Sequence, residues 1–527
     1  MRSTFMGLEA SKSGLFLQQT ALYTTGHNIS NANSLGYSRQ RVNMQAMPGY
    51  PFPGLNSPKY PGHLGTGAEA HSIQRVRDEF IDRKYRQETN KLGYWEEQTK
   101  AISQMEDILA EPSEFGINKA FDNFWKSMED VVTNPQDTAA RQVMIAKARA
   151  LAEAFNYSDK QLKTVQSNIG AEINSSVNTV NSLLKQIADI NRQIMEAEPS
   201  GYVTNDLYDA RDVLLDKLNE YLPVSTERVP SGGNASPVAE GSLTVTYTPY
   251  GSDKPIILVH GRDSANLTVM KKNGIPLNGD KPLDPFEGMR IDWPQDAVTQ
   301  TNPDKLLSGA VLPTGTVHKY SEFENERGKL VSLIKSYGYI DDNDGGATKG
   351  LYPENLEKLD RLVKEFVDTF NAAHQGGYGL DGSTSIDFFD PNGVTAETIK
   401  VSITKPEEVA AADLPNELGN NKNILAIAKL QTEAPPGLGG ATFQGFFKAM
   451  IGDIGVIGQE AIRSEFNSGT LRLNVENRRA SMSSVSLDEE MTNMITFQQA
   501  YNANARMITV VDETLDKIIN GMGRVGL

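Results

Sequence analysis

The chain has 527 residues, which is too long for a single hydrophobic core, so its length predicts several domains. Its 51 basic and 67 acidic side chains give a formal net charge of -16, which disfavours nucleic acid and anionic membrane surfaces as partners. The sequence contains no cysteine, which excludes disulfide bonds, thiol catalysis and thiolate metal sites.

Apolar runs are short throughout the chain. The beginning of the sequence lacks the hydrophobic stretch of a secretory signal peptide, and no run of about 18 apolar residues occurs that would span a membrane. We therefore expect a protein that is soluble or is exported by a route without a cleaved signal, and we expect no membrane partner.

The first predicted helix carries a narrow apolar stripe on an otherwise polar segment. The members of this stripe recur with heptad spacing and are Leu8, Leu15, Leu22 and Ile29. A stripe this narrow cannot bury itself alone, so the helix requires a partner helix.

An asparagine-rich segment, 28–40, follows this helix. Its polar and turn-forming residues are Asn28, Asn31, Asn33, Gly36, Tyr37, Ser38 and Arg39. Asparagine caps helix carbonyls and tolerates left-handed backbone, and glycine permits a positive φ, so the segment is typical of a helix exit followed by an extended strand. The asparagines could also bind a ligand, but a helix-ending turn needs none.

Two long amphipathic segments predict a helical rod. The first runs from Ile73 to Leu109, and the second from Gln136 to Glu198 contains no proline and a single glycine. The second would be about 90 Å long if it were continuous, at about 1.5 Å per residue. Its coiled-coil seam consists of Ile169, Ile173, Val180, Leu183, Ile187, Ile190 and Ile194. An aromatic helix at 117–132 lies between the two segments and is expected to close the end of the bundle.

The sequence pattern changes between 225 and 319, where short runs of apolar residues, or of alternating apolar and polar residues, are separated by glycine, proline and asparagine. This pattern is typical of strands and turns and predicts a β-rich domain inserted into the helical one. Helical patterns return at 321–337 and 353–373, further strands are expected within 387–403, and helix dominates after Thr442.

The last predicted helix has a stripe like that of the first. Its members are Leu487, Met494, Tyr501, Ile508 and Leu515. Ser486 and Glu489 have the spacing of a capping box at its start. The two terminal helices are therefore predicted to pair, and the nine stripe positions form the predicted interface.

These patterns predict a mainly α-helical, multidomain protein with a long coiled-coil-like helical domain, an inserted β-rich domain, and paired N- and C-terminal helices. The expected divisions are 1–66 with 484–527 for the terminal assembly domain, 67–224 with 320–483 for the elongated helical domain, and 225–319 for the inserted outer domain.

Catalytic and metal-binding patterns are weak. The six histidines are scattered, and no two have the i, i+4 spacing of a helical metal site. Segment 377–382 matches GxGxxG but follows a helix and opens none, which favours a flexible turn. Segment 341–346 begins like a calcium loop, yet its twelfth position is Tyr352 instead of a carboxylate. We predict no catalytic residue, no metal and no cofactor.

Acid–base work by Asp206 and Asp209 is an alternative to a structural role for the cluster Asp209, Arg211 and Asp212. Because acidic residues at a helix start complement the helix dipole and an arginine is close in sequence, the structural interpretation is favoured.

Four segments carry a resemblance to a known family: 28–40, 205–212, 371–376 with Phe388 and Phe389, and 486–501. The first resembles the signature of axial proteins of the bacterial flagellum, and its Gly-Tyr-Ser-Arg-Gln ending is similar to that of the hook-associated proteins of the hook-filament junction, the FlgK family. Segment 205–212 resembles a motif shared with flagellin-like helical domains, the other two resemble further elements of the FlgK family, and 225–319 matches none.

The resemblance implies a non-enzymatic structural subunit that forms a short ring between hook and filament. It implies hook protein, a second junction protein and copies of the chain itself as partners, and an export chaperone that holds the C-terminal helix. It also implies secretion through the flagellar export channel to an extracellular location.

Three alternatives are weighed against this assignment. A hook or rod axial protein would resemble the chain only at its ends. A wall hydrolase carried in the inserted domain would need convergent acids, which 225–319 does not show at a telling spacing. A cytoplasmic coiled-coil adaptor would explain the heptads but not the asparagine-rich exit.

Overall fold

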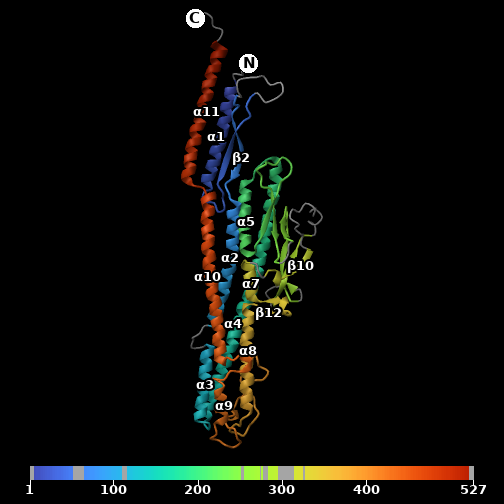
Figure 1. Ribbon diagram of the computed structural model, residues 1–527, viewed down its shortest axis with the longest axis vertical. Helices are drawn as coiled ribbons and strands as arrows, with labels where there is room; N and C mark the ends of the chain where they lie inside the picture. The colour runs from blue at the N-terminus through green and yellow to red at the C-terminus, as the bar shows by residue number, and fades with distance from the viewer. Residues whose placement is uncertain are drawn as a thin grey trace.

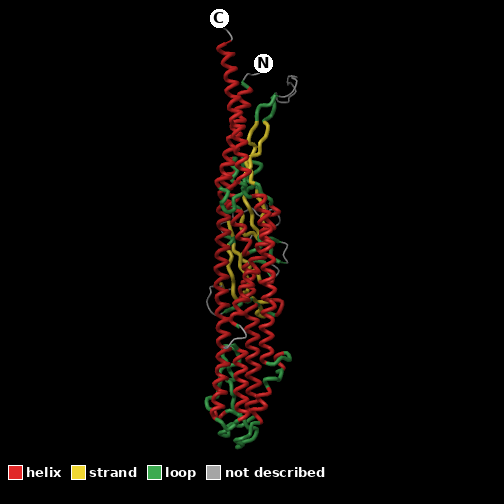
Figure 2. Tube along the Cα trace, turned by 90° about the vertical axis from the view of Figure 1, so that its left-hand side faces the viewer, coloured by secondary structure: helices red, strands yellow, loops and turns green. Residues whose placement is uncertain are grey.

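The computed structural model describes residues 5–50, 64–109, 116–250, 254–272, 275–276, 283–294, 314–323 and 327–521. The molecule is a long, thin rod in two perpendicular views, with its first and last helices side by side at one end (Figures 1 and 2). Across the described ranges, the helices found are too short or too polar to cross a membrane.

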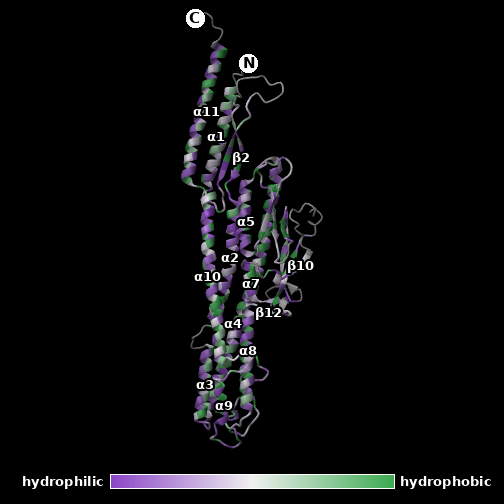
Figure 3. Ribbon diagram, in the orientation of Figure 1, coloured by the Kyte–Doolittle hydropathy of each residue, from purple (hydrophilic) through white to green (hydrophobic). Residues whose placement is uncertain are grey.

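Helices make up most of the rod. They are α1 (Met6–Ser30), α2 (Glu79–Ile108), α3 (Ile117–Thr133), α4 (Thr138–Ala197), α5 (Asn205–Tyr221), α7 (Lys329–Tyr337), α8 (Leu351–Gln375), α9 (Lys422–Lys429), α10 (Phe443–Ser483) and α11 (Leu487–Gly521). Hydrophobic and hydrophilic residues alternate along the long helices, as expected for helices that bury one face (Figure 3).

The predicted long helix is continuous. α4 has 60 residues and begins at Asp137, whose carboxylate accepts a hydrogen bond from Ala139 N at 2.8 Å. The predicted seam is confirmed, because Ile173, Val180, Ile187 and Ile194 are fully buried and the remaining members are buried or half-buried. The seam packs in one hydrophobic core that runs along the rod.

The far end of the rod is closed by aromatic residues, as the helix at 117–132 predicted. Phe124 and Phe366 pack at 6.1 Å between ring centroids, and Phe366 contacts Phe389 at 5.2 Å. These side chains are fully buried and hold α3, α8 and the segment after α8 together.

The strands form three sheets. Their bounds are β1 (Gln40–Ala46), β2 (Ala68–Arg75), β3 (Ser225–Val229), β4 (Ser242–Tyr247), β5 (Ile256–His260), β6 (Asp263–Ser264), β7 (Asn266–Lys271), β8 (Ile275–Pro276), β9 (Phe286–Asp292), β10 (Thr314–Lys319), β11 (Tyr339–Asp341) and β12 (Ala347–Lys349). β1 and β2 form an antiparallel pair beside α1. The other sheets have the orders β3-β4-β5-β6 and β12-β11-β9-β7-β8, with β10 on β9.

The β-rich region packs against the side of α4. Asn181 exchanges two hydrogen bonds with the backbone of Leu267, at 2.9 and 2.8 Å, and Asn191 does the same with Leu243, at 2.8 and 3.0 Å. Two α4 amides therefore fix both sheets on the rod. The larger sheet also includes β11 and β12, which lie beyond residue 319, the predicted end of the inserted domain. The domain divisions stay a prediction.

Three local predictions differ from the structure. Residues 68–75 form a strand, because Ile73 pairs with Val42 and the next helix begins only after the Asp78 cap. Of the helix expected at 321–337, the structure shows α7 from Lys329, since Gly328 has a φ of 113° that an α-helix cannot include, and 324–326 lie outside the described residues. Phe80, an apolar residue within the amphipathic segment predicted from Ile73 to Leu109, is 60% exposed instead of buried.

The strands expected within 387–403 reduce to one bridge between Phe389 and Val401. The reason is that the Asn371 side chain takes the hydrogen bonds that a neighbouring strand would otherwise make with this backbone. Asn371 Oδ1 accepts from Phe388 N and Phe389 N at 3.0 and 2.9 Å, and its amide donates to Phe389 O at 2.9 Å.

His374 ties two backbone segments together in this region. Its Nδ1 donates to Ile386 O at 2.7 Å, and its Nε2 accepts from Ala410 N at 2.9 Å, so the neutral ring is required. Burial lowers the pKa of His374 to about 4.

Acidification should therefore destabilise the rod through His374. An unfolded histidine takes up its proton near pH 6.5, whereas the folded one resists protonation to about pH 4, so the free energy of unfolding falls as pH drops between these values. Urea unfolding at pH 7 and pH 5 should show a loss roughly 2 kcal/mol larger for the parent than for His374→Gln. Equal losses would mean that His374 titrates normally.

Candidate functional site: the terminal helix pair and its neck

α1 and α11 pair, as predicted, and the structure shows that their orientation is antiparallel. A β-carbon on Gly7 would lie 3.8 Å from Val511 Cγ2, and one on Gly14 would lie 3.0 Å from the Asn504 amide. Seven residues further along α1, the neighbour on α11 is therefore seven residues earlier in the sequence. The close approach at Gly14 requires a small residue. The segments nearest the two chain ends thus form a single unit, which we call the terminal pair.

The predicted stripe residues are half-buried with one exception. The half-buried members are Leu8, Leu15, Leu22, Ile29, Met494, Tyr501, Ile508 and Leu515. Leu487 is 49% exposed at the start of α11. The pair alone therefore leaves its stripe only partly covered.

A second apolar surface on the terminal pair was not predicted. It consists of large side chains that are 42 to 76% exposed: Phe5, Phe16 and Tyr23 on or beside α1, and Leu487, Met491, Ile495, Met507, Val510, Ile518 and Ile519 on α11. We call it the outer face. The heptad spacing of Phe16 and Tyr23 and the i, i+4 spacing of Met491 and Ile495 were signals that could have found it.

Three segments lie where the terminal pair meets the rod, and together we call them the neck. The chain crosses from one to the other at 75–78 and 483–486, and it turns from α1 into β1 at 38–40. Backbone hydrogen bonds join the three segments: Arg39 N donates to Ser483 O at 2.9 Å, and Val76 N donates to Arg39 O at 2.8 Å.

Asn28 of the predicted motif organises the helix exit. Its amide donates to Gln40 O at 2.8 Å and to Glu490 Oε2 at 3.1 Å, while its Oδ1 accepts from Gln40 N and Tyr37 Oη at 2.9 Å each. One buried side chain therefore joins α1, β1 and α11. Glu490 is 2% exposed and is held also by Arg39 Nε at 2.7 Å.

The remaining motif residues shape the turn between α1 and β1. Asn31 donates its amide to His27 O at 3.1 Å, which caps the helix, and Asn33 is exposed. The Tyr37 hydroxyl lies 2.9 Å from His27 Nδ1, and burial with the nearby Asp206, Asp209 and Glu490 raises the pKa of Tyr37.

Gly36 has a φ of 80°, and a β-carbon there would lie 2.1 Å from Val213 Cγ2 on α5. Gly36→Ala should therefore destabilise the protein by about 1–3 kcal/mol through strain and a clash at the neck. Gly26→Ala in α1 is the matched control, since no atom lies within 4 Å of its β-carbon position. The two variants should separate in urea unfolding, and equal midpoints would contradict the turn geometry.

Ser38 and Arg75 connect the neck to α5. Asp209 accepts from Ser38 N at 2.9 Å, from Ser38 Oγ at 2.7 Å and from Arg75 Nη1 at 2.7 Å. Burial raises the pKa of Asp209 in spite of these donors. The sequence alone did not indicate the partners of this aspartate, which lie more than a hundred residues earlier.

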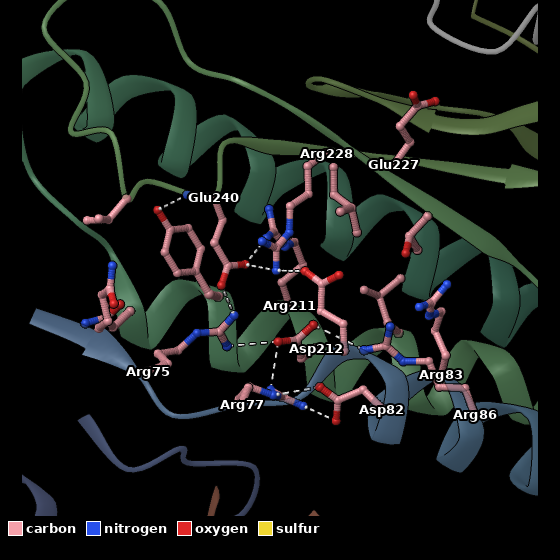
Figure 4. Close-up of a pocket in the computed structure, with 18 residues that line it drawn as sticks. Arg75, Arg77, Asp82, Arg83, Arg86, Arg211, Asp212, Glu227, Arg228 and Glu240 are labelled. Atoms are coloured by element: carbon pink, nitrogen blue, oxygen red, sulfur yellow. Dashed lines mark hydrogen bonds and ion pairs between the residues drawn. The ribbon is translucent and has the colours of Figure 1, made fainter. Parts of the chain in front are cut away.

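Asp212 lies one turn further along α5 and pairs with three arginines: Arg75 at 2.8 Å, Arg77 at 2.7 Å and Arg86 at 3.1 Å (Figure 4). Burial would raise its pKa, but the surrounding guanidinium groups outweigh burial and hold the pKa below its usual range. Asp212 therefore carries a charge at every physiological pH.

Other carboxylates extend this ion network around the neck. Glu240 accepts from Arg75 at 2.6 Å and Arg211 at 3.2 Å, and Arg479 of α10 pairs with Asp82 at 2.8 Å and Asp216 at 2.7 Å. The guanidinium groups of Arg75 and Arg211 also lie 5.1 and 5.3 Å from the centroid of the Tyr208 ring.

A cavity of about 500 Å³ adjoins the network, and Figure 4 shows charged side chains from β2, α2, α5 and the β-rich region around it. The carboxylates of Asp212 and Glu240, which line it, and of the neighbouring Asp209 are engaged by arginines, which favours the structural interpretation of Asp209, Arg211 and Asp212. Within the ranges that the structure describes, no group of three histidine or acidic residues is placed to hold a metal ion.

The whole chain matches known proteins. The family model described as the flagellar hook-associated protein FlgK helical domain matches residues 102–389. A relative in Bacillus subtilis named flagellar hook-associated protein 1 is 38% identical, with 99% of each chain covered. The chain belongs to the FlgK family. A Salmonella typhimurium relative of the same name is 25% identical over 96% of this chain and 98% of its own.

Two further matches of this FlgK-family chain concern its C-terminal region and its overall fold. The model of the flagellar basal body rod FlgEFG protein C-terminal region matches only 477–521, which is the end of α10 and α11. The solved flagellar hook junction protein FlgK from Burkholderia pseudomallei covers 78% of this chain and all of its own, with a TM-score of 0.57 at 13% identity. That likeness supports the fold of the FlgK-family chain.

Proposed function

We propose that the protein is a structural subunit of the bacterial flagellum that joins the hook to the filament and polymerises through its terminal pair. One observation carries this proposal: the first and last helices bury their stripes only partly and leave further large apolar side chains, those of the outer face, exposed. A surface of this kind gains burial when subunits assemble.

The partners follow from this role. The subunit contacts hook protein on one side, a second junction protein on the other, and copies of itself around a short ring. Before assembly, an export chaperone holds α11, whose i, i+4 apolar residues Met491 and Ile495 suit a helix-binding groove. The protein leaves the cell through the flagellar export channel and acts outside it.

The proposed domain roles follow the same plan. Residues 1–66 with 484–527 form the assembly domain, 67–224 with 320–483 form the elongated helical domain, and 225–319 form the outer domain. We assign no enzymatic activity, because the acidic residues at the neck are engaged in ion pairs that hold elements together.

Electron microscopy of filament bases tests the role directly. Cells that lack the gene should produce hooks without filaments, and expression of the parent chain should restore filaments. Normal filaments in the deletion strain would overturn the proposal.

The runner-up is a hook or rod axial protein, supported by the rod-protein match at 477–521. The same micrographs decide between them, because loss of a hook or rod subunit would remove the hook itself. The match of a FlgK helical domain to 102–389 favours the junction role.

A further inference from the structure

The neck contains an unusual concentration of buried charge. The side chains of Arg75, Asp209 and Arg77 are 4, 7 and 9% exposed, and those of Arg86 and Asp212 are 11 and 15% exposed. Such pairs add little stability over well-packed apolar residues, but breaking one leaves a buried charge without its partner. The network therefore resists any movement that separates its members.

The members of the network come from both sides of the neck. Asp209 holds the exit of α1 through Ser38 and the end of β2 through Arg75. Asp212 holds Arg75 again, together with Arg77 before α2 and Arg86 within it. Two aspartates one turn apart on the rod helix α5 thus bind, through hydrogen bonds and ion pairs, the segments that lead directly into the terminal pair.

The backbone bonds of the neck do not supply this connection. The bonds from Arg39 N to Ser483 O and from Val76 N to Arg39 O join the three neck segments to one another, and neither involves α5. Among the hydrogen bonds of the described residues, those between the neck segments and α5 use side chains of α5, which include Asp206, Asp209 and Asp212. Asp206 is mostly exposed, so the two buried aspartates carry most of the constraint.

We propose that Asp209 and Asp212 are positioning residues that set the direction in which the terminal pair leaves the rod. In a ring every subunit repeats the same direction, so an error at the neck is repeated at every contact. The consequence for assembly rests on the proposed function. The positioning itself is a property of the free chain and can be measured there.

The absence of cysteine from the sequence allows a clean distance measurement. Gln87→Cys on α2 and Gln498→Cys on α11 place a spin label on each side of the neck, at exposed positions. Pulsed electron paramagnetic resonance on the full-length monomer should give one narrow distance maximum. Asp209→Asn and Asp212→Asn should each broaden or shift this maximum, while Asp189→Asn, an exposed aspartate on α4, should leave it unchanged.

Circular dichroism separates positioning from folding. The Asp209→Asn variant should keep the helical signal of the parent and still lose the narrow maximum, and Ser38→Ala, which keeps every charge, should shift the maximum in the same way. If Asp212→Asn fails to fold, these two variants decide the question. A narrow, unshifted maximum in both would overturn the proposal, as would a lower melting temperature without a change in distance.

A filament assay completes the test. Asp209→Asn should reduce filament number in cells whose variant protein is exported and folded. If the distance maximum broadens while filaments stay normal, Asp209 positions the terminal pair but this positioning is not needed for assembly. If neither the distance maximum nor the filament number changes, both the positioning and its role in assembly are wrong.

Discussion

Filaments should fail to grow from hooks in cells that carry Ile508→Asp. Ile508 is half-buried on α11, which packs on α1, and an aspartate there places a charge without a partner on a partly buried surface of the terminal pair. The penalty of roughly 2–3 kcal/mol is repeated in every subunit of a ring, so its effect on assembly is much larger than on one chain. Electron microscopy of filament bases measures the result.

Two further assays identify the cause. The melting of the rod should barely change in Ile508→Asp, because the core seam lies elsewhere, whereas recovery of the protein on isolated hooks should fall sharply. Asn502→Asp adds the same charge at an exposed position of α11 and should behave like the parent. Parental recovery of Ile508→Asp on hooks would mean that assembly does not need this contact.

Ile187→Asp should destabilise the rod strongly, and more than Gly36→Ala destabilises it at the neck. Ile187 is fully buried in the α4 seam, so the substitution both removes packing and buries a carboxylate, at a cost of roughly 3–5 kcal/mol. Gln186→Asp, at the adjacent exposed position, should cost less than about 1 kcal/mol. Urea unfolding followed by circular dichroism compares them, and coincident midpoints would rule out the buried seam.

Periodic features were predictable from the sequence because each depends on residues close together in the chain. The seam around Ile187 and the stripe around Ile508 both follow from helical spacing, and Gly36 was identified from the turn chemistry around it. The prediction that the terminal helices pair needed only the argument that a narrow stripe cannot bury itself, and the structure confirms it.

The neck was not predictable in the same way. Asp212 was recognised as part of a charged cluster, but its partners Arg75, Arg77 and Arg86 are brought to it by tertiary structure, which no local pattern records. The outer face was missed for a related reason: Phe16 and Tyr23 resemble core residues in the sequence, and only the position of α11 shows which face of α1 is left uncovered.

The antiparallel terminal pair has a consequence for the order of folding. The hydrogen bond between Asn28 and Glu490 spans 462 residues, so the contact order at the neck is near the maximum for this chain. Packing of α10 on α2 brings the start of α11 close to α1, which shortens the loop that remains to be closed. α1 consequently stays without its partner until α11 has been synthesised, and a chain cut short before Leu487 offers no complete docking end. If subunits assemble through the terminal pair, as proposed, this late pairing restricts assembly to chains that carry both helices.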